Sequence, residues 1–210
     1  MSTTVIAEVG STHNGDLKLA KELVKIAYEC GADAVKFQLL TDREVVGGNI
    51  LLPWEWLPDL RHDKIEVFAS VFSKEGILFL EKHKFKSIKF AYSQQELFKE
   101  NQLYDFNMTY LSSGVNDIQY QPSLALCGNM INLFCIPCYP VLYDVNFDGI
   151  FPRFDGWSSH ALGIRQELKA VEAGATTLEC HFKGTWDSPC PDAKFAKSPK
   201  ELTELCKKVK

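Results

Sequence analysis

Short apolar runs alternate with longer segments of helical period along the 210-residue chain. The first run, TTVIAEVG (residues 3–10), is rich in β-forming residues and predicts a strand. DLKLAKELVKIAYECG (residues 16–31) follows, with apolar residues three or four positions apart, and it predicts a helix that Asp16 can cap and Gly31 can end. DAVKFQLL (residues 33–40) predicts the next strand. The tight connections of this strand–helix–strand unit predict two parallel strands.

The same alternation continues to the end of the chain. Further strands are predicted at residues 64–72, 87–92, 108–114, 130–137, 153–159 and 176–182. Further helices are predicted at residues 73–84, 93–101, 115–128, 161–175 and 198–210. Two connections, residues 41–64 and 139–151, carry no clear helical pattern. Eight strands with intervening helices favour one compact (β/α)8 TIM barrel over residues 1–210, and the alternative is an open doubly wound sheet, which normally has fewer strands.

Composition narrows the possible functions. Apolar residues make up 46% of the chain and charged residues 24%, as in ordinary globular proteins. A net charge of −4 argues against nucleic acid and anionic membrane surfaces as partners. No apolar run approaches the length of a membrane span, and the first residues do not resemble a secretory signal. The seven scattered cysteines do not suggest a disulfide framework, so we expect a cytoplasmic protein with reduced thiols.

Polar residues gather at the carboxyl ends of the predicted strands, where TIM barrels carry their catalytic groups. Taken singly, each has a common structural explanation, such as a hydrogen-bonded histidine or a lysine that reaches solvent. Taken together they predict one site. The candidates are Glu8, His13, Asn14, Lys36, Gln38, Ser70, Lys89, Ser112, Ser113, Ser158, His160, Glu179 and His181.

Two lysines in this set indicate an anion site. Lys36 and Lys89 lie within otherwise apolar strands, where burying an unpaired ammonium group is costly. An anionic ligand in the barrel mouth would offset that cost. With serine hydroxyls on neighbouring strands, the lysines predict a site for phosphate or carboxylate.

Two histidines indicate a metal site. His160 and His181 end adjacent predicted strands, and parallel neighbours are about 4.8 Å apart, so both imidazoles can reach one divalent ion. Imidazole suits Mn, Fe, Co and Zn, and two ligands leave positions open for substrate and water. Glu179 shares the strand face of His181 and could orient a ligand, take a proton or bind substrate.

These motifs closely resemble those of the sialic acid (N-acetylneuraminate) synthase family. VIAEVGSTHNGDLKLAKELVKIAYECGADAVKFQ resembles the IAEIG-x-NHNG opening and the GADAVKFQ strand of that family. GWSSHALGIRQELKAVEAGATTLECHF resembles its GYSDHT-x-G helix and GA-x-x-x-E-x-HF strand, and SPCPDAKFAKSPKEL resembles its GPDH segment. FASVFS, SIKFA, YLSSG and CIPCYP match the middle strands less strongly.

The resemblance implies a TIM-barrel transferase that forms a carbon–carbon bond in carbohydrate biosynthesis. Phosphoenolpyruvate condenses with an N-acylated hexosamine such as N-acetylmannosamine, and the products are a nonulosonic acid and phosphate. A divalent ion, Mn or Mg, is held by the residues matching His160 and His181 and polarises the sugar aldehyde. The phosphoenolpyruvate methylene carbon attacks the aldehyde, water adds at the carbon that bears the phosphate, and C–O cleavage releases phosphate.

The resemblance also assigns roles to individual residues. Glu8 matches a glutamate that handles a proton or water. Glu179 and Asp192 match residues on the sugar and metal side, and Tyr139 matches a tyrosine near the substrate. The residues that match the phosphate and carboxylate site are Lys36, Ser70, Lys89, Ser112 and Ser158.

The chain departs from the family mainly on the sugar side. Ser159 stands where the family usually has Asp, Pro137 where it has a substrate-contacting Asn, and Tyr92 where a Ser is common. Cys190 and Ala193 replace the Gly and His of the GPDH motif. The sequence stops after the helix that is predicted to follow the eighth strand, so we expect no C-terminal antifreeze-like domain within it. Family members pair through that domain, so a homodimer is an open expectation.

Three alternatives remain at this stage. CIPC (residues 135–138) could form a redox or zinc site, although Pro140 and a poor helical pattern follow and no second CxxC exists. The barrel could bind phosphoenolpyruvate or a sugar acid with altered or no synthase activity. LLPWEWLPDL (residues 51–60) could form a lid or an interface, or could pack beneath the barrel's loops.

Overall fold

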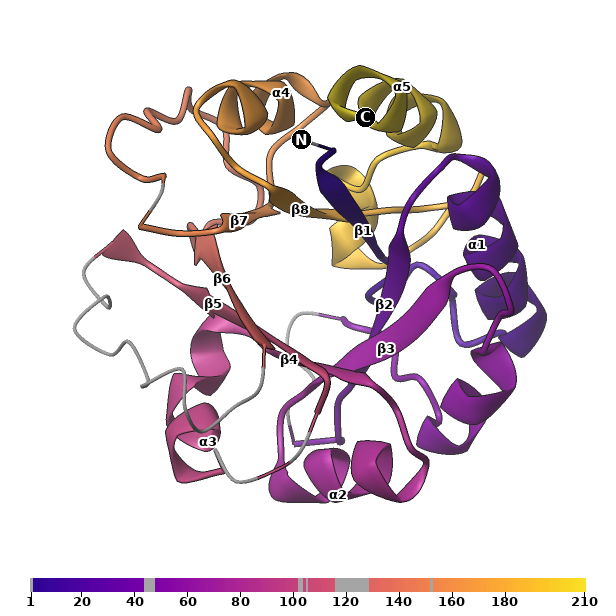
Figure 1. Cartoon of the computed structure of the whole chain (residues 1–210). Coiled ribbons are helices and arrows are strands. Elements are labelled where there is room, and N and C mark those ends of the chain that lie inside the picture. Colours follow the sequence, from indigo (N-terminus) through magenta and orange to yellow (C-terminus); the bar gives the residue numbers. More distant parts are fainter. Residues whose placement is uncertain (1, 44–47, 102–103, 105, 116–128, 152) are drawn as a thin grey trace.

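The computed structural model shows a closed barrel of parallel strands (Figure 1). It describes residues 2–43, 48–101, 104, 106–115, 129–151 and 153–210. The strands follow one another around the barrel in chain order, and β1 pairs with both β2 and β8. This closure confirms the predicted TIM barrel and excludes the open doubly wound sheet. The strands are β1 (Thr4–Glu8), β2 (Ala34–Leu39), β3 (Glu66–Val71), β4 (Ser87–Phe90), β5 (Met108–Ser113), β6 (Asn129–Cys135), β7 (Gly156–Ser159) and β8 (Thr177–His181).

Helices surround the strands on the outside of the barrel (Figure 1). The two ends of the chain lie side by side, because Thr3 N donates a hydrogen bond of 3.3 Å to Val209 O. The α-helices are α1 (Leu17–Glu29), α2 (Lys74–Lys82), α3 (Gln95–Glu100), α4 (Arg165–Glu172) and α5 (Pro199–Val209). The 3₁₀ helices described are η1 (Trp54–Leu60), η2 (Tyr92–Gln94) and η4 (Pro191–Lys194).

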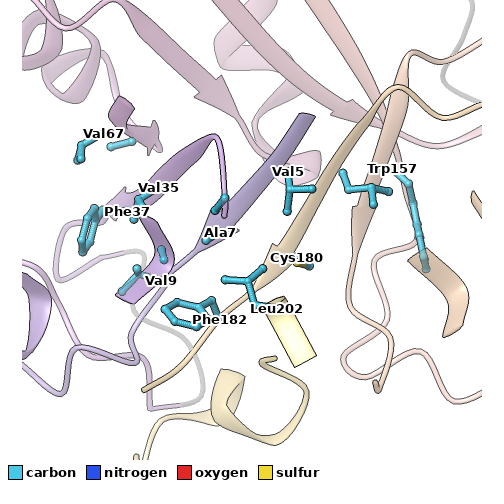
Figure 2. Close-up of a cluster of buried hydrophobic side chains, with 14 of the residues drawn as sticks. Val5, Ala7, Val9, Val35, Phe37, Val67, Trp157, Cys180, Phe182 and Leu202 are labelled. Atoms are coloured by element: carbon cyan, nitrogen blue, oxygen red, sulfur yellow. The ribbon is translucent and has the colours of Figure 1, made fainter. Parts of the chain in front are cut away.

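Strand alternation divides the core into two parts. Val5 and Ala7 of β1, and Val9 directly after it, belong to the large apolar cluster between strands and helices, which Figure 2 shows in part. Ile6 belongs instead to a small cluster with residues of other strands inside the barrel. Glu8 has the same parity as Ile6, so the inner face of β1 ends in a carboxylate at the barrel's carboxyl end.

Local signals fix the ends of α1 as the sequence predicts. Asp16 Oδ1 accepts hydrogen bonds from Lys18 N at 2.6 Å and from Leu19 N at 3.2 Å. Gly31 follows the helix with a φ of +92°, which a residue with a Cβ adopts only with strain. By contrast, α4 begins four residues later than the predicted start, because Ala161 still pairs with Val141 in a parallel β-bridge.

The two connections without helical pattern contain no α-helix in the residues that the structure describes. Residues 139–151 form turns and loops. Residues 41–64 include η1, whose Leu57 and Leu60 are buried in the large cluster, while Trp54 Nε1 donates to Leu40 O at 3.0 Å. The Trp-rich segment therefore packs beneath the loops. The helix predicted at residues 115–128 falls, apart from residue 115, outside the described residues.

Within the described residues, no helix has both the length and the apolar character needed to cross a bilayer. The six cysteines described there form no disulfide bond.

Candidate active site

One cavity of about 720 Å³ opens at the carboxyl ends of the strands. This is the end of the barrel at which TIM-barrel enzymes place their active sites. The cavity brings together residues from six strands and two loops that sequence analysis had named. They are Lys36, Gln38, Ser70, Lys89, Ser112, Tyr139, Ser158, His160, Glu179, His181 and Asp192.

A buried ion network crosses the floor of this cavity. Lys36 Nζ lies 2.7 Å from Glu8 Oε2 and 3.5 Å from Glu179 Oε2, and Lys89 Nζ lies 3.1 Å from the same Glu179 oxygen. Ser158 Oγ donates to Glu179 Oε1 at 2.9 Å. Both lysines therefore have carboxylate partners within the protein, and these partners offset part of the cost of burying the ammonium groups. Each lysine ammonium group has three N–H donors, so both lysines can still donate to a ligand while they contact Glu179 Oε2.

Burial and charge shift the pKa values of this network in different directions. Burial alone would raise the pKa of Glu179, but Lys36 and Lys89 outweigh it and lower that pKa well below its ordinary value. Burial raises the pKa of Glu8 to about 7 despite the opposing charge of Lys36. Burial also lowers the pKa of Lys89, whereas the two glutamates overcome burial at Lys36 and raise its pKa. Glu179 is thus the permanent anion of the network, and Glu8 is the member that can change charge near neutral pH.

The two strand-end histidines face each other across the same cavity. Their ring centroids lie 5.5 Å apart. His160 Nδ1 lies 3.2 Å from Ile136 O, and since a carbonyl can only accept, Nδ1 is the donor and Nε2 carries the lone pair. Burial lowers the pKa of both His160 and His181 to about 3. Both imidazoles are therefore neutral at physiological pH, which is the form that binds metal ions.

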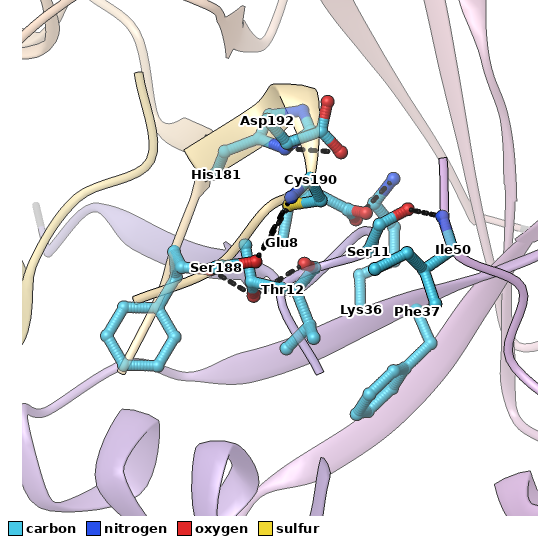
Figure 3. Close-up of polar contacts among 12 residues, drawn as sticks. Glu8, Ser11, Thr12, Lys36, Phe37, Ile50, His181, Ser188, Cys190 and Asp192 are labelled. Carbon is cyan, nitrogen blue, oxygen red and sulfur yellow. Dashed lines mark hydrogen bonds and ion pairs between the residues drawn. The ribbon is translucent and has the colours of Figure 1, made fainter. Parts of the chain in front are cut away.

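Asp192 lies beside His181 (Figure 3). Its Oδ2 lies 3.7 Å from His181 Nδ1, which is too long for a hydrogen bond, and that buried nitrogen has no hydrogen-bond partner among the described residues. Gly10 leaves room for the Asp192 carboxylate beside His181, because a Cβ on residue 10 would lie only 2.6 Å from Asp192 Oδ2.

The donors fit a divalent ion with open coordination positions. Two neutral imidazoles, one of them with an unpaired buried nitrogen, can supply part of a catalytic coordination shell. No set of three or more His, Cys, Asp or Glu side chains that could hold a metal ion is found in the described part of the chain. The remaining ligands would therefore have to come from water or substrate.

Two aromatic rings that line the cavity pack against the histidines. The ring of Tyr139 lies 4.0 Å from that of His160, and its side chain is more than half exposed. Phe195 is buried, and its ring lies 4.8 Å from His181 and 5.8 Å from His160. Sequence analysis named Tyr139 but missed Phe195, because a phenylalanine in a loop carries no signal of its own. Four polar lining residues were also missed, because none of them ends a predicted strand: Asn49, Ser93, Gln94 and Lys194.

Four of the named candidates do not line the cavity: Glu8, His13, Asn14 and Ser113. Glu8 is buried, and its carboxylate contacts Lys36, which does line the cavity. His13 Nδ1 accepts a hydrogen bond from Gly15 N at 3.0 Å, and Asn14 bonds to Asp187 O at 3.2 Å. His13 and Asn14 therefore organise the loop after β1. Burial lowers the pKa of His13 to about 4, so this imidazole too is neutral at physiological pH.

Among the residues that the structure describes, the CIPC pair lacks the features that a redox or zinc site requires. Cys135 lines the cavity, but burial raises the pKa of its thiol to about 12, so it carries no thiolate at neutral pH. Cys138 is exposed and its Sγ donates to Pro140 O at 3.3 Å. The two residues follow β6 into an irregular loop, with no helix start to lower a thiol pKa.

Comparison with known proteins identifies the family. The NeuB family model matches residues 49–210. The chain is 30% identical to the N,N'-diacetyllegionaminic acid synthase of Campylobacter jejuni, over 99% of this chain and 75% of that protein. It is 29% identical to the enzyme of the same name from Legionella pneumophila, over 100% of this chain and 72% of that protein. In fold it is similar to the N-acetylneuraminic acid synthetase of Leptospira borgpetersenii, with a TM-score of 0.78 and 23% identity over 100% of this chain and 83% of that one. The chain therefore belongs to the NeuB family.

Proposed function

We propose that this protein condenses phosphoenolpyruvate with an N-acylated hexosamine, in a metal-dependent reaction that yields a nonulosonic acid and inorganic phosphate. Membership of the NeuB family supports the reaction type, since its named relatives here are synthases of sialic-type acids. The observation that carries the proposal is the arrangement of the cavity. A lysine-lined floor for an anion adjoins a pair of neutral histidines suited to a divalent ion.

The floor of the cavity suits the phosphate and carboxylate of phosphoenolpyruvate. Lys36 and Lys89 present ammonium groups there, and a charge-assisted hydrogen bond to an anionic oxygen is stronger than a neutral one. Ser112 Oγ is buried and has no hydrogen-bond partner among the described residues, so a donor is already desolvated for a ligand. Ser70 lines the same floor.

Glu8 is suited to handle a proton in this reaction. A carboxyl group with a pKa of about 7 exists in both forms at neutral pH, so it can donate or accept a proton at Oε1 or Oε2. Its Oε2 lies 2.7 Å from Lys36, which places it at the edge of the anion floor. Glu179 remains ionised and keeps both lysine ammonium groups oriented.

The histidine side of the cavity suits the sugar aldehyde. His160 and His181 would hold the divalent ion, Mn or Mg, and such an ion supplies polarisation of a carbonyl oxygen when it is bound. Asp192 and Tyr139 line the same side, where they can hydrogen-bond to sugar hydroxyls. The rings of Tyr139 and Phe195 pack against His160 and His181 on this side.

A phosphate-release assay tests the proposal. The purified protein is incubated with Mn²⁺ or Mg²⁺, phosphoenolpyruvate and a panel of N-acyl aldohexoses that includes N-acetylmannosamine. The expected result is phosphate release that requires both substrates, stops with a chelator, and accompanies a product whose mass is that of a nonulosonic acid. Tight binding of phosphoenolpyruvate without phosphate release from any sugar would contradict synthase activity and favour a binding protein that keeps the barrel.

A further inference from the structure

A second buried ion pair lies outside the cavity, on the helix side of β7 and β8. Lys197 is only 1% exposed and Glu167 is 0% exposed, and Lys197 Nζ lies 2.8 Å from Glu167 Oε1. Lys197 precedes α5, and Glu167 lies in α4. Neither residue lines the cavity, and the proposed reaction uses neither of them.

Lys197 hydrogen-bonds to the backbone at His181 and directly after His160, the two cavity histidines. Its backbone N donates to the carbonyl oxygen of His181 at 2.6 Å. Its side-chain Nζ donates to the carbonyl oxygen of Ala161, the residue that follows His160, at 2.5 Å. A single residue therefore ties the end of β8 to the segment that extends β7, and those two segments carry the two facing imidazoles.

Glu167 and Ser159 complete the connection on the other side of His160. Ser159 Oγ donates to Glu167 Oε1 at 2.7 Å, and Ala161 N donates to Ser159 Oγ at 3.2 Å. The residues immediately before and after His160 are thus both fastened to the Lys197–Glu167 pair. Because side chains alternate along a strand, Ser159 points to the helices while His160 points into the cavity.

Stability alone is a poor explanation for this pair. Desolvation of two charges roughly cancels their attraction, and well-packed apolar residues of similar volume are often as stable as a buried ion pair. Glu167 Oε2 also lacks a hydrogen-bond partner among the described residues, which is a further cost. What an apolar pair could not do is hydrogen-bond the Ala161 carbonyl and the Ser159 hydroxyl, so the specific contribution of the pair is geometric.

We propose that Lys197, with Glu167 as its counter-ion, is a positioning residue that fixes the spacing of His160 and His181 and thereby the affinity of their metal site. This inference rests on the proposed function. It predicts that removing the hydrogen bonds of the Lys197 side chain weakens metal binding. The anion site formed by Lys36 and Lys89 should keep its affinity for phosphoenolpyruvate.

The test replaces the ion pair without leaving a buried charge. The double variant Lys197→Met with Glu167→Gln keeps both side-chain volumes but removes the donor to Ala161. The matched control is Lys208→Met with Glu204→Gln, which removes a half-exposed pair of 2.9 Å on α5. Calorimetric titration with Mn²⁺ alone, without substrates, should show affinity about tenfold weaker or more in the double variant and unchanged in the control. Affinity for phosphoenolpyruvate should stay within about twofold of wild type in both.

A crystal structure of the double variant gives a readout that is independent of metal and of turnover. The histidine rings should leave their 5.5 Å separation or occupy several positions. Rings in the original position together with unchanged Mn²⁺ affinity would overturn the inference. If the double variant does not fold, Ser159→Ala, which removes only one hydroxyl, should still weaken Mn²⁺ binding, and an unchanged affinity would again overturn it. Failure of the wild-type protein to bind Mn²⁺ or release phosphate would instead refute the proposed function, and the ring positions in the variant would then decide this inference alone.

Discussion

The ammonium group of Lys89 lies 3.1 Å from Oε2 of Glu179, although β4 and β8 stand on opposite sides of the closed barrel. The contact spans the barrel interior, and Lys36 reaches the same carboxylate oxygen from β2. One glutamate therefore holds two lysines at the floor of the cavity. Removal of either lysine leaves this carboxylate with a single cationic partner.

Lys89→Met should weaken the binding of phosphoenolpyruvate. The substitution removes a charged donor from a desolvated site, which typically costs about 1.5–3 kcal/mol, or roughly ten- to a hundredfold in affinity. Titration calorimetry with phosphoenolpyruvate measures the loss. Lys25→Met, which removes a solvent-exposed pair with Glu29 on α1, is the control and should bind normally. Equal affinity in the Lys89 variant and wild type would place the anion elsewhere.

His160→Ala and His181→Ala should each abolish both Mn²⁺ binding and phosphate release. Each substitution removes one of two protein ligands, and one imidazole is a weak site for a divalent ion. Manganese titration followed by electron paramagnetic resonance measures binding without turnover. His62→Ala, near the amino end of β3, should behave as wild type. Activity that survives a chelator, or that persists in either cavity variant, would count against the metal role.

Binding of a divalent anion should weaken as pH rises through about 7, because Glu8 has a pKa of about 7. Below this pH the carboxyl group is neutral and leaves the lysine charge available, and above it the carboxylate competes with the ligand for Lys36. Sulfate is the best probe, since its own charge is constant from about pH 6 to about pH 8. The affinity of the wild-type protein for sulfate should fall several-fold over this range, because deprotonation of Glu8 is linked to release of the anion. The affinity of Glu8→Gln for sulfate should stay constant. A parallel pH dependence in both proteins would remove Glu8 as the cause.

Cys135→Ser should retain synthase activity. The Cys135 thiol lines the cavity, but burial raises its pKa to about 12, so it is protonated and is not a nucleophile at neutral pH. Serine places a hydroxyl of similar size at this position, so turnover should stay within a few-fold of wild type. The small loss reflects the cost of burying a polar hydroxyl among partly apolar neighbours. Steady-state phosphate release measures this, with Cys138→Ser at the exposed neighbour as comparison. A loss of turnover as large as that of the histidine variants would revive a role for the thiol.

Much of the fold could be predicted because the signals that define it are local. The cap at Asp16 and the left-handed turn at Gly31 act over a few residues, and the alternation of Val5 and Ile6 assigns each to a side of its strand. The start of α4 was predicted too early, because Ala161 pairs with Val141, twenty residues away in sequence, and helical propensity cannot register that contact.

For the site, the sequence by itself determined most of the polar residues that line the cavity, although four of the named candidates do not reach it. Strand parity and the position of each residue at a carboxyl end sufficed for Lys36, Lys89, His160 and His181. Only the tertiary structure decided their partners. Glu179 meets lysines from β2 and β4, and Lys197 reaches the carbonyl beyond His160. These contacts join residues up to 143 positions apart, as in the pair of Lys36 and Glu179, and they exist because closure of the barrel and the register of its strands bring those side chains together. The periodicity of a strand predicts the direction in which a side chain points. The group that this side chain contacts depends on the position of every strand between the two residues.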